Sequence, residues 1–422
     1  MKKQIYTFTL VMSLYGCSRQ ELSQMSPTSS ERDEITRTSP SNLVLANNVS
    51  VTYTDESSFV ESLAMYDFKS IDQLNLNRQG QVSGYNSTYG FNIPADRQVK
   101  GFKWNKGDQD TKEWRPQGIT GFERNGKTYL ITTWYGVGPS NIPGVHNQHK
   151  GVRVSLVDIT NMSNITYRHI LLVQNKENMG NSELYRPSNP YTQLEGYAPV
   201  TIHAGGVAYY DGKIYVADTR LGIRVFDLDK FISAEGDVNK NKIGVEHSST
   251  LKAFDYGYIL PQIGYYKITD GSPFSCIALG EGSTSLEKRL WTGQYLAPDA
   301  GRTPTIYGFP INEQGQLYGN VESISPLDKY DTPVYRMQGV YRSNAKTVMT
   351  TTGNGNYEGS TARLVRYSDG TAAATRYRWP HGAEDLYLDT STGLLWNLTE
   401  YETEKYGKEN RAVFAVRYAD YD

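Results

Sequence analysis

The feature that most constrains the fold is a repeated pair of strands. Five times along the chain, a turn of Gly or small polar residues opens a short apolar strand, and a second apolar strand follows. The openings read, in chain order, "PQGITGF", "AGGVAYY", "FSCIALG", "MQGVYRS" and "AEDLYLD". A repeated unit of this length buries its faces only against its neighbours, which is typical of a β-propeller. We therefore predict an all-β fold, a five-bladed β-propeller, with a sixth blade before Trp104 as the alternative.

The fifth repeat is one strand short when the chain ends. The segment 49–99 precedes the first repeat and belongs to none of the five, so we predict that it supplies the missing outer strand and closes the ring. The first strands of the first two repeats are the most widely spaced. We therefore expect the longest loops in blades one and two.

The N-terminus has the features of an export signal. Lys2 and Lys3 precede an apolar stretch that ends at Cys17. This stretch is shorter than the roughly 20 residues that a membrane-spanning helix needs. The segment 14–17, "LYGC", resembles a bacterial lipobox, and Ser18 resembles the residue that sorts Gram-negative lipoproteins to the outer membrane. This resemblance implies a lipoprotein signal peptide at 1–17 with lipidation at Cys17, and an ordinary export signal remains the alternative.

The composition divides the rest of the chain into two parts. Residues 18–46 are rich in Ser, Thr, Gln, Glu and Pro, so we predict a disordered polar tether, with the propeller domain at 47–422. The 43 basic and 45 acidic side chains nearly balance, and no basic stripe stands out, so nucleic acid is not expected as a partner. We expect a monomer in the bacterial cell envelope, as an outer-membrane lipoprotein on its periplasmic or surface face, or secreted.

Several long stretches resemble a known family. They include "FKWNKGDQDTKEWRPQGITG", "VTIHAGGVAYYDGKIYVADTRLGIRVFDL" and "EDLYLDTSTGLLWNLTE", and the resemblance spans roughly residues 100 to 418. The family consists of largely uncharacterised secreted β-propeller-like proteins common in actinobacteria. It has no established activity, so the resemblance implies a fold and export but no catalytic residues.

A more distant similarity concerns the strand openings. "PQGI" and "AGGVAYYDGKIYVADT" are similar to strictosidine-synthase-like and gluconolactonase-like propellers, which hold a divalent metal on the central axis. The matching positions here are Gln117, Gly205, Ser275, Gln338 and Glu384. Only one is a carboxylate, whereas Ca²⁺ takes about six to eight oxygen ligands. We therefore expect no cofactor, with Ca²⁺ as the alternative.

The aligned openings also predict a site in the axial funnel. There we expect polar contacts from the inner ends of the first strands and aromatic stacking surfaces close by. The predicted ligand-binding residues are Gln117, Trp114, Trp134, Gln338 and Arg224, and the tentative catalytic residues are His203 and Glu384.

The carboxylates at the openings argue against a standard hydrolase. Glycoside hydrolysis needs at least two converging carboxyl groups. Glu384 and Asp385 are neighbours on one predicted strand, so we expect their side chains to point to opposite faces. The sequence therefore favours a module that binds a glycan or another envelope ligand. An enzyme acting on a sugar acid, either a polysaccharide lyase or a lactonase-like hydrolase, remains the alternative.

Overall fold

The computed structural model describes residues 49–137, 151–178, 192–237, 240–247, 250–282, 287–319, 323–343, 345–352, 362–369 and 374–421. These residues all belong to one compact unit of the chain. The predicted signal peptide, Cys17 and the tether at 18–46 lie outside the described residues. Among the described helices, none has the length and apolar character needed to cross a bilayer.

The described secondary structure is nearly all β, as predicted. The first meander consists of β4 (Trp114–Arg124), β5 (Lys127–Gly136), β6 (Val152–Asp158) and β7 (Thr166–Asn175). The second consists of β10 (Val207–Tyr210), β11 (Lys213–Asp218), β12 (Gly222–Asp227) and β16 (Tyr258–Ile268). The outer strands β7 and β16 pair in parallel, so both meanders belong to one continuous sheet. For this reason the count of five separate blades stays a prediction.

Three four-stranded sheets follow along the chain. The third meander contains β17 (Cys276–Glu281), β18 (Lys288–Gly293), β19 (Thr305–Pro310) and β20 (Asp328–Asp331). The fourth contains β21 (Met337–Ser343), β22 (Lys346–Thr351), β23 (Arg363–Ser368) and β24 (Thr375–Arg378). The fifth contains β25 (Ala383–Asp389), β26 (Leu394–Thr399) and β27 (Val413–Arg417), and its outer strand is β3 (Gln98–Phe102). The fifth meander thus takes its outer strand from the N-terminal side, as predicted, although β3 begins only at the end of the predicted segment 49–99.

The segment before β3 runs along the outside of the meanders. β1 (Val51–Asp55) pairs with β16, and β2 (Arg78–Gln79) pairs with β7. A helix, α1 (Ser57–Ser62), follows β1 and packs Phe59 and Val60 into the core. This segment thus joins the second, first and fifth meanders before the first repeat begins.

The remaining elements are short. A three-stranded sheet is formed by β8 (Thr192–Gln193), β14 (Lys242–Glu246) and β15 (Thr250–Ala253). β9 (Tyr197–Pro199) pairs with β7, and β13 (Ile232–Ser233) pairs with β16. The other helices are α2 (Lys106–Asp110), α3 (Thr403–Tyr406) and 3-10 turns at Ala64–Tyr66, Ile71–Gln73, Tyr85–Ser87, Ala95–Arg97, Lys176–Asn178 and Tyr418–Tyr421.

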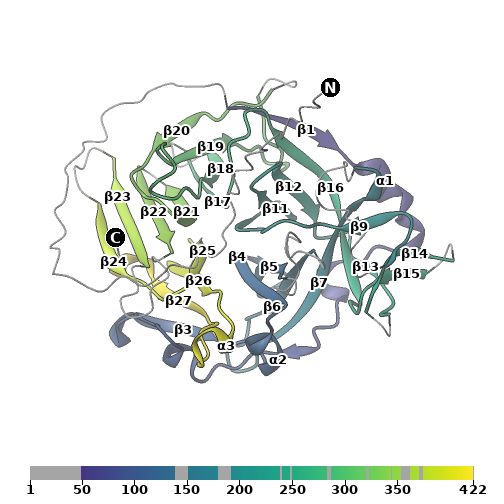
Figure 1. Ribbon diagram of the computed structural model, residues 1–422, viewed down its shortest axis with the longest axis horizontal. Helices are drawn as coiled ribbons and strands as arrows, with labels where there is room; N and C mark the ends of the chain where they lie inside the picture. Colours follow the sequence, from purple (N-terminus) through teal and green to yellow (C-terminus); the bar gives the residue numbers. More distant parts are fainter. Residues whose placement is uncertain are drawn as a thin grey trace, which may run out of the picture. The chain divides into compact units, whose positions relative to one another are not determined.

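The first strands of the five meanders form a circle. Each of β4, β10, β17 and β21 contacts the next, and β25 contacts both β21 and β4 (Figure 1). Small residues permit this close approach. A Cβ on Gly206 would lie 2.4 Å from the backbone nitrogen of Ile277, and one on Gly339 would lie 2.9 Å from the Cα of Asp385. Glycine at the repeat openings is therefore a steric requirement of the circle.

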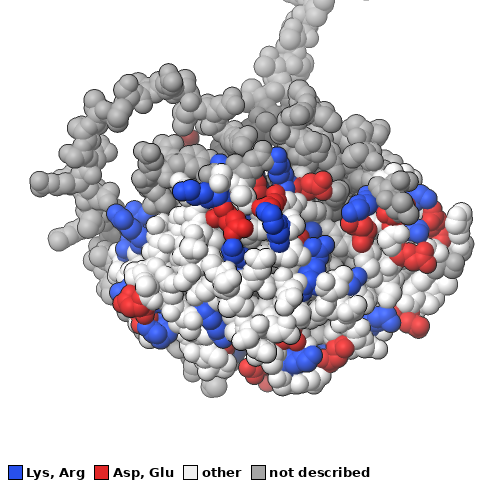
Figure 2. Space-filling view, turned by 90° about the horizontal axis from the view of Figure 1, so that it is seen from below, with Lys and Arg blue, Asp and Glu red and all other residues white. Residues whose placement is uncertain are grey.

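Burial decreases from the centre outwards. In the fourth meander β21 is buried over nearly its whole length, β23 only in part, and β24 exposes three of its four residues. Strands covered on both faces need continuous apolar runs, which explains why the inner strands dominate the sequence pattern. On the surface, acidic and basic side chains are interspersed on the face shown in Figure 2.

Candidate functional site

Three of the five inner strands carry a β-bulge at the repeat opening. The pairing register shifts between Pro116 and Ile119 in β4, between Met337 and Gly339 in β21, and between Ala383 and Leu386 in β25. The polar residues inside these bulges are Gln117 in β4, Gln338 in β21, and Glu384 and Asp385 in β25. A bulge re-aims side chains and leaves a residue unpaired in the ladder. The repeat alignment therefore located three bulges, although it did not predict that they were bulges.

Glu384 lies at the centre of the candidate site. Its side chain is fully buried, and its Oε1 accepts a hydrogen bond of 3.3 Å from the Gln338 amide. Its carboxyl also lies near that of Glu400, which follows β26, and the two groups interact electrostatically. Burial raises the pKa of Glu384 well above its usual range, and the nearby Glu400 and Asp385 raise it further. Glu384 therefore keeps its proton to a higher pH than an exposed Glu does.

Glu400 connects this pair to a wider group of polar side chains. Its Oε1 accepts a hydrogen bond of 3.1 Å from the Tyr135 hydroxyl at the end of β5. The Arg115 guanidinium lies 3.9 Å from Glu400 and 3.4 Å from Glu402. Residues from the first and fifth meanders thus build one connected polar group beside the inner-strand openings.

Asp385 also points toward the centre of the circle. Its Oδ2 accepts hydrogen bonds from the backbone N–H of Ile119 at 3.2 Å and of Val207 at 3.1 Å. Burial raises the pKa of Asp385 well above its usual range. Glu384 contacts Gln338 on β21 whereas Asp385 contacts β4 and β10, so the two neighbouring side chains have partners on different inner strands. Asp385 ties three inner strands together.

His203 lies beside this polar group. Its ring is 4.7 Å from the Tyr135 ring, and the side chain is only partly buried. Burial lowers the pKa of His203 below its ordinary value, which outweighs the opposite effect of Glu400. A neutral imidazole therefore lies next to Tyr135 at neutral pH. His203, Gln338 and Glu384 are thus connected through Glu400 and Tyr135.

The other predicted ligand-binding residues are buried and contact the protein itself. Gln117 is buried, and its amide donates to the carbonyl of Pro116 at 3.1 Å. Trp134 is fully buried and Trp114 nearly so, and the Arg153 guanidinium lies 4.6 Å from each ring centre. Trp134 therefore presents no surface on which a ligand could stack, because its ring belongs to the core.

Arg224 is also committed to a structural role. Its Nε donates to Asp218 at 2.8 Å, and its Nη1 donates to Gln174 and Gln262 at 2.9 Å each. Gln174 belongs to β7, whereas Gln262 belongs to β16. Arg224 thus bridges the first two meanders at the point where they form one sheet.

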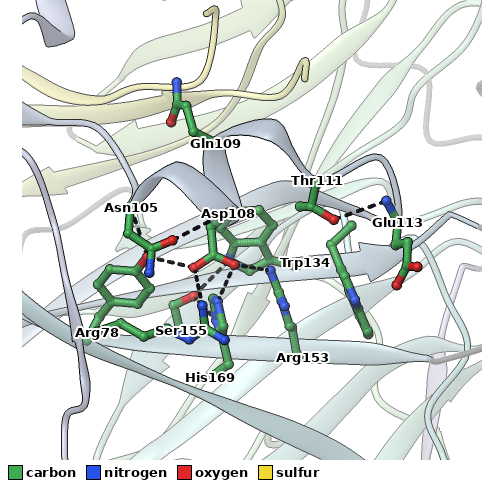
Figure 3. A network of polar contacts seen from close by, with 12 residues as sticks. Arg78, Asn105, Asp108, Gln109, Thr111, Glu113, Trp134, Arg153, Ser155 and His169 are labelled. Atoms are coloured by element: carbon green, nitrogen blue, oxygen red, sulfur yellow. Dashed lines mark hydrogen bonds and ion pairs between the residues drawn. The ribbon is translucent and has the colours of Figure 1, made fainter. Parts of the chain in front are cut away.

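A second buried polar network surrounds Asp108 in α2 (Figure 3). Asp108 Oδ1 lies 3.1 Å from the Arg153 guanidinium and 3.0 Å from His169 Nε2, and Ser155 Oγ lies 2.8 Å from His169 Nδ1. Trp134 Nε1 donates to the same Ser155 oxygen at 2.8 Å. The order of Ser, His and Asp is that of a hydrolase triad. Ser155 is fully buried and its oxygen is engaged by Trp134, so the network stabilises the core.

The protonation of His169 fits this structural role. Burial, and secondarily the Arg153 charge, lower the pKa of His169 to about 3. A neutral ring can donate from Nε2 to Asp108 while its Nδ1 accepts from the Ser155 hydroxyl. Each of these residues then has a hydrogen-bond partner. Asp108 has a pKa well below its usual range: burial acts to raise it, but His169, Arg153 and Arg78 outweigh that effect.

Some members of the axial group could have been found from the sequence. In an antiparallel hairpin the end of the second strand returns to the start of the first. Tyr135 lies near the end of β5 and Glu400 directly follows β26. Both could therefore be expected beside the openings of their repeats. Within the described residues, no group of three or more His, Cys, Asp or Glu side chains is arranged to hold a metal ion. Cys276 is buried and unpaired with another Cys.

Comparisons with known proteins do not identify a family for the chain. No family model matches the chain, and no curated protein matches it. A GH43 β-xylosidase/α-arabinofuranosidase from a compost metagenome is 10% identical, with a TM-score of 0.38, over 72% of this chain and 92% of that one. A GH43_1 enzyme from Xanthomonas citri is 10% identical, with a TM-score of 0.34, over 72% of this chain and 87% of that one.

A third solved structure is described as the Dos1 propeller. It is 8% identical, with a TM-score of 0.29, over 72% of this chain and 73% of that one. Likenesses this low carry no argument about activity. The resemblance to the actinobacterial family and to the strictosidine-synthase-like propellers therefore stays a prediction.

Proposed function

We propose that the chain is a five-bladed β-propeller, anchored through lipid at Cys17 outside the cytoplasm, that binds a glycan at its axial site. The observation that carries the binding function is the interacting pair of Glu384 and Glu400. With Gln338, Tyr135 and His203, this pair offers donors and acceptors of the kind that bind sugar hydroxyls.

The five-blade count rests on topology. Each meander has four antiparallel strands, and the inner strands contact one another in a circle. The parallel pairing of β7 with β16 involves only outer strands, so it joins two blades without removing either. The lipid anchor rests on the sequence alone, because Cys17 lies outside the described residues.

The geometry of the carboxyl pair favours binding over glycoside hydrolysis. Retaining glycosidases hold their two carboxyl groups about 5–5.5 Å apart and inverting enzymes about 6.5–9.5 Å apart. Glu400 acts directly on the Glu384 carboxyl and raises its pKa, which indicates that the two groups lie closer together than either spacing.

One observation favours a second candidate, a polysaccharide lyase. Such an enzyme needs a neutral base and a cation that neutralises the substrate carboxylate. His203 has a pKa lowered by burial, and Tyr135 lies between it and the Arg115 region. In this reading His203 or Tyr135 would remove the proton beside a uronate carboxyl held by Arg115.

A binding screen tests the proposal. The full chain is titrated with neutral and acidic polysaccharides, and the shift of its thermal unfolding temperature is recorded for each. We expect at least one neutral glycan to stabilise the protein and this shift to disappear in Gln338→Ala, which removes the amide that donates to Glu384. Gln81→Ala is the control, because Gln81 is exposed on the outer N-terminal segment. An equal shift in Gln338→Ala would refute the axial site.

A further inference from the structure

We propose a second carbohydrate site, a cavity between the third and fourth meanders that holds one pyranose ring. The cavity has a volume of about 300 Å³. Its lining includes Trp291, Asp328, Tyr330, Arg342, Ala345 and Asp369. This volume lies at the lower end of the range for ligand pockets, so it suits a single sugar rather than a longer segment.

The cavity lies at the far ends of the inner strands from the axial site. β21 begins with the bulge at Gln338 and ends at Ser343, so Arg342 belongs to its far end. Ala345 lies in the turn to β22, and Asp369 directly follows β23. The strand β21 therefore runs from one proposed site to the other.

The guanidinium of Arg342 is fixed in one orientation. Nη1 donates to Thr347 Oγ1 at 2.7 Å and to Asp369 Oδ1 at 3.0 Å, and Nη2 donates to Asp369 Oδ2 at 2.5 Å. The guanidinium carbon lies 4.0 Å from the centre of the Tyr330 ring and 5.5 Å from that of Trp291. A donor group held against two rings loses little freedom when a ligand binds.

The charges of the lining favour a neutral ligand. Arg342 pairs with Asp369, and Arg289 donates to Asp328 at 3.1 Å. Arg289 also pairs with Glu287, so the carboxylates outnumber the two guanidinium groups and no unpaired cation attracts an anion. A charged ligand would have to displace one of these partners.

The hydrogen-bonding capacity of the lining fits hydroxyl groups. An ionised carboxylate has about four acceptor positions, and Asp369 uses two for Arg342 while its side chain stays 42% exposed. A sugar hydroxyl both donates and accepts, so it can donate to Asp369 or Asp328 while accepting from the guanidinium. Tyr330 and Trp291 supply the aromatic part of this lining, next to the guanidinium that lies against them.

Saturation-transfer NMR on the full chain tests this site. The probes are glucose, galactose, mannose and xylose, each titrated separately. Ala345→Tyr places a ring at the exposed rim of the cavity, and Ala345→Gly is the matched control that leaves it open. We expect at least one sugar to bind, the affinity to fall by about tenfold or more in Ala345→Tyr, and the control to match wild type within about twofold.

Two results would overturn the proposal. In the first, none of the four sugars shows saturation transfer from the wild-type chain. In the second, a sugar that binds the wild-type chain binds Ala345→Tyr with the same affinity. Gln338→Ala separates this site from the axial one. Loss of transfer in Gln338→Ala but not in Ala345→Tyr would keep the axial site and refute the second one, and the reverse pattern is the result we expect.

Discussion

Replacing Glu384 with Gln should make the protein more stable at neutral pH. The side chain is fully buried and in contact with Glu400 and Gln338, so its carboxyl keeps a proton in the native state. A Gln amide at this position would donate to Glu400 and accept from Gln338 without needing a proton. The variant therefore preserves both contacts and removes the ionisable carboxyl group of Glu384.

The sign and size of the effect follow from proton linkage. An unfolded Glu loses its proton near pH 4.3, whereas native Glu384 has a pKa well above that value. Between the two values the native state holds a proton that the unfolded state has released, so rising pH favours unfolding. One proton changes the free energy of unfolding by about 1.4 kcal/mol per pH unit in this window.

Urea denaturation at a series of pH values from 4 to 8 measures the effect. We expect the stability of Glu384→Gln relative to wild type to increase as pH rises above about 4.3. Glu402→Gln is the control with the opposite sign. Burial acts to raise the pKa of Glu402, but Arg115 and Arg411 outweigh it and hold the pKa below its ordinary value. A constant difference between Glu384→Gln and wild type at every pH would refute the raised pKa of Glu384.

Three further outcomes are expected. Native His169 has a pKa of about 3 against about 6.5 when unfolded, so its contribution should be lost as pH falls from 6.5 to 3, and His169→Gln should flatten that part of a denaturation profile. Ala345 has a φ of 64° and is exposed, so Ala345→Gly should raise the free energy of unfolding by about 0.5–1 kcal/mol in urea titrations. Cys17→Ser should abolish labelling of the expressed chain by a fatty-acid analogue and release it from membranes, whereas labelling that persists would contradict the lipid anchor.

The repeat in the sequence predicted much of the fold. The inner strands are covered on both faces, so their apolar runs and their Gly-containing openings are visible without a structure. The closing strand β3 was also predictable, because the fifth repeat lacked an outer strand. The parallel pairing of β7 with β16 was not, since nothing local in either strand specifies a partner in another meander.

Only part of the candidate site could be predicted from the sequence. Aligning the openings identified Gln338 and Glu384, whose contact the structure contains. The interaction with Glu400 depends on where a hairpin returns, and the two backbone N–H groups that Asp385 accepts from belong to other repeats. Trp134 reads in the sequence like an aromatic residue beside a funnel, yet neighbouring strands bury it completely.

The central claim is that the pair of Glu384 and Glu400 binds a glycan without cleaving it. The most direct test is to incubate each glycan that stabilises the full chain with the wild-type protein and to analyse it by mass spectrometry and ultraviolet absorbance. The account predicts that the glycan is recovered unchanged. Shorter chains, or an unsaturated uronate product that disappears in Glu384→Gln or His203→Ala, would contradict it.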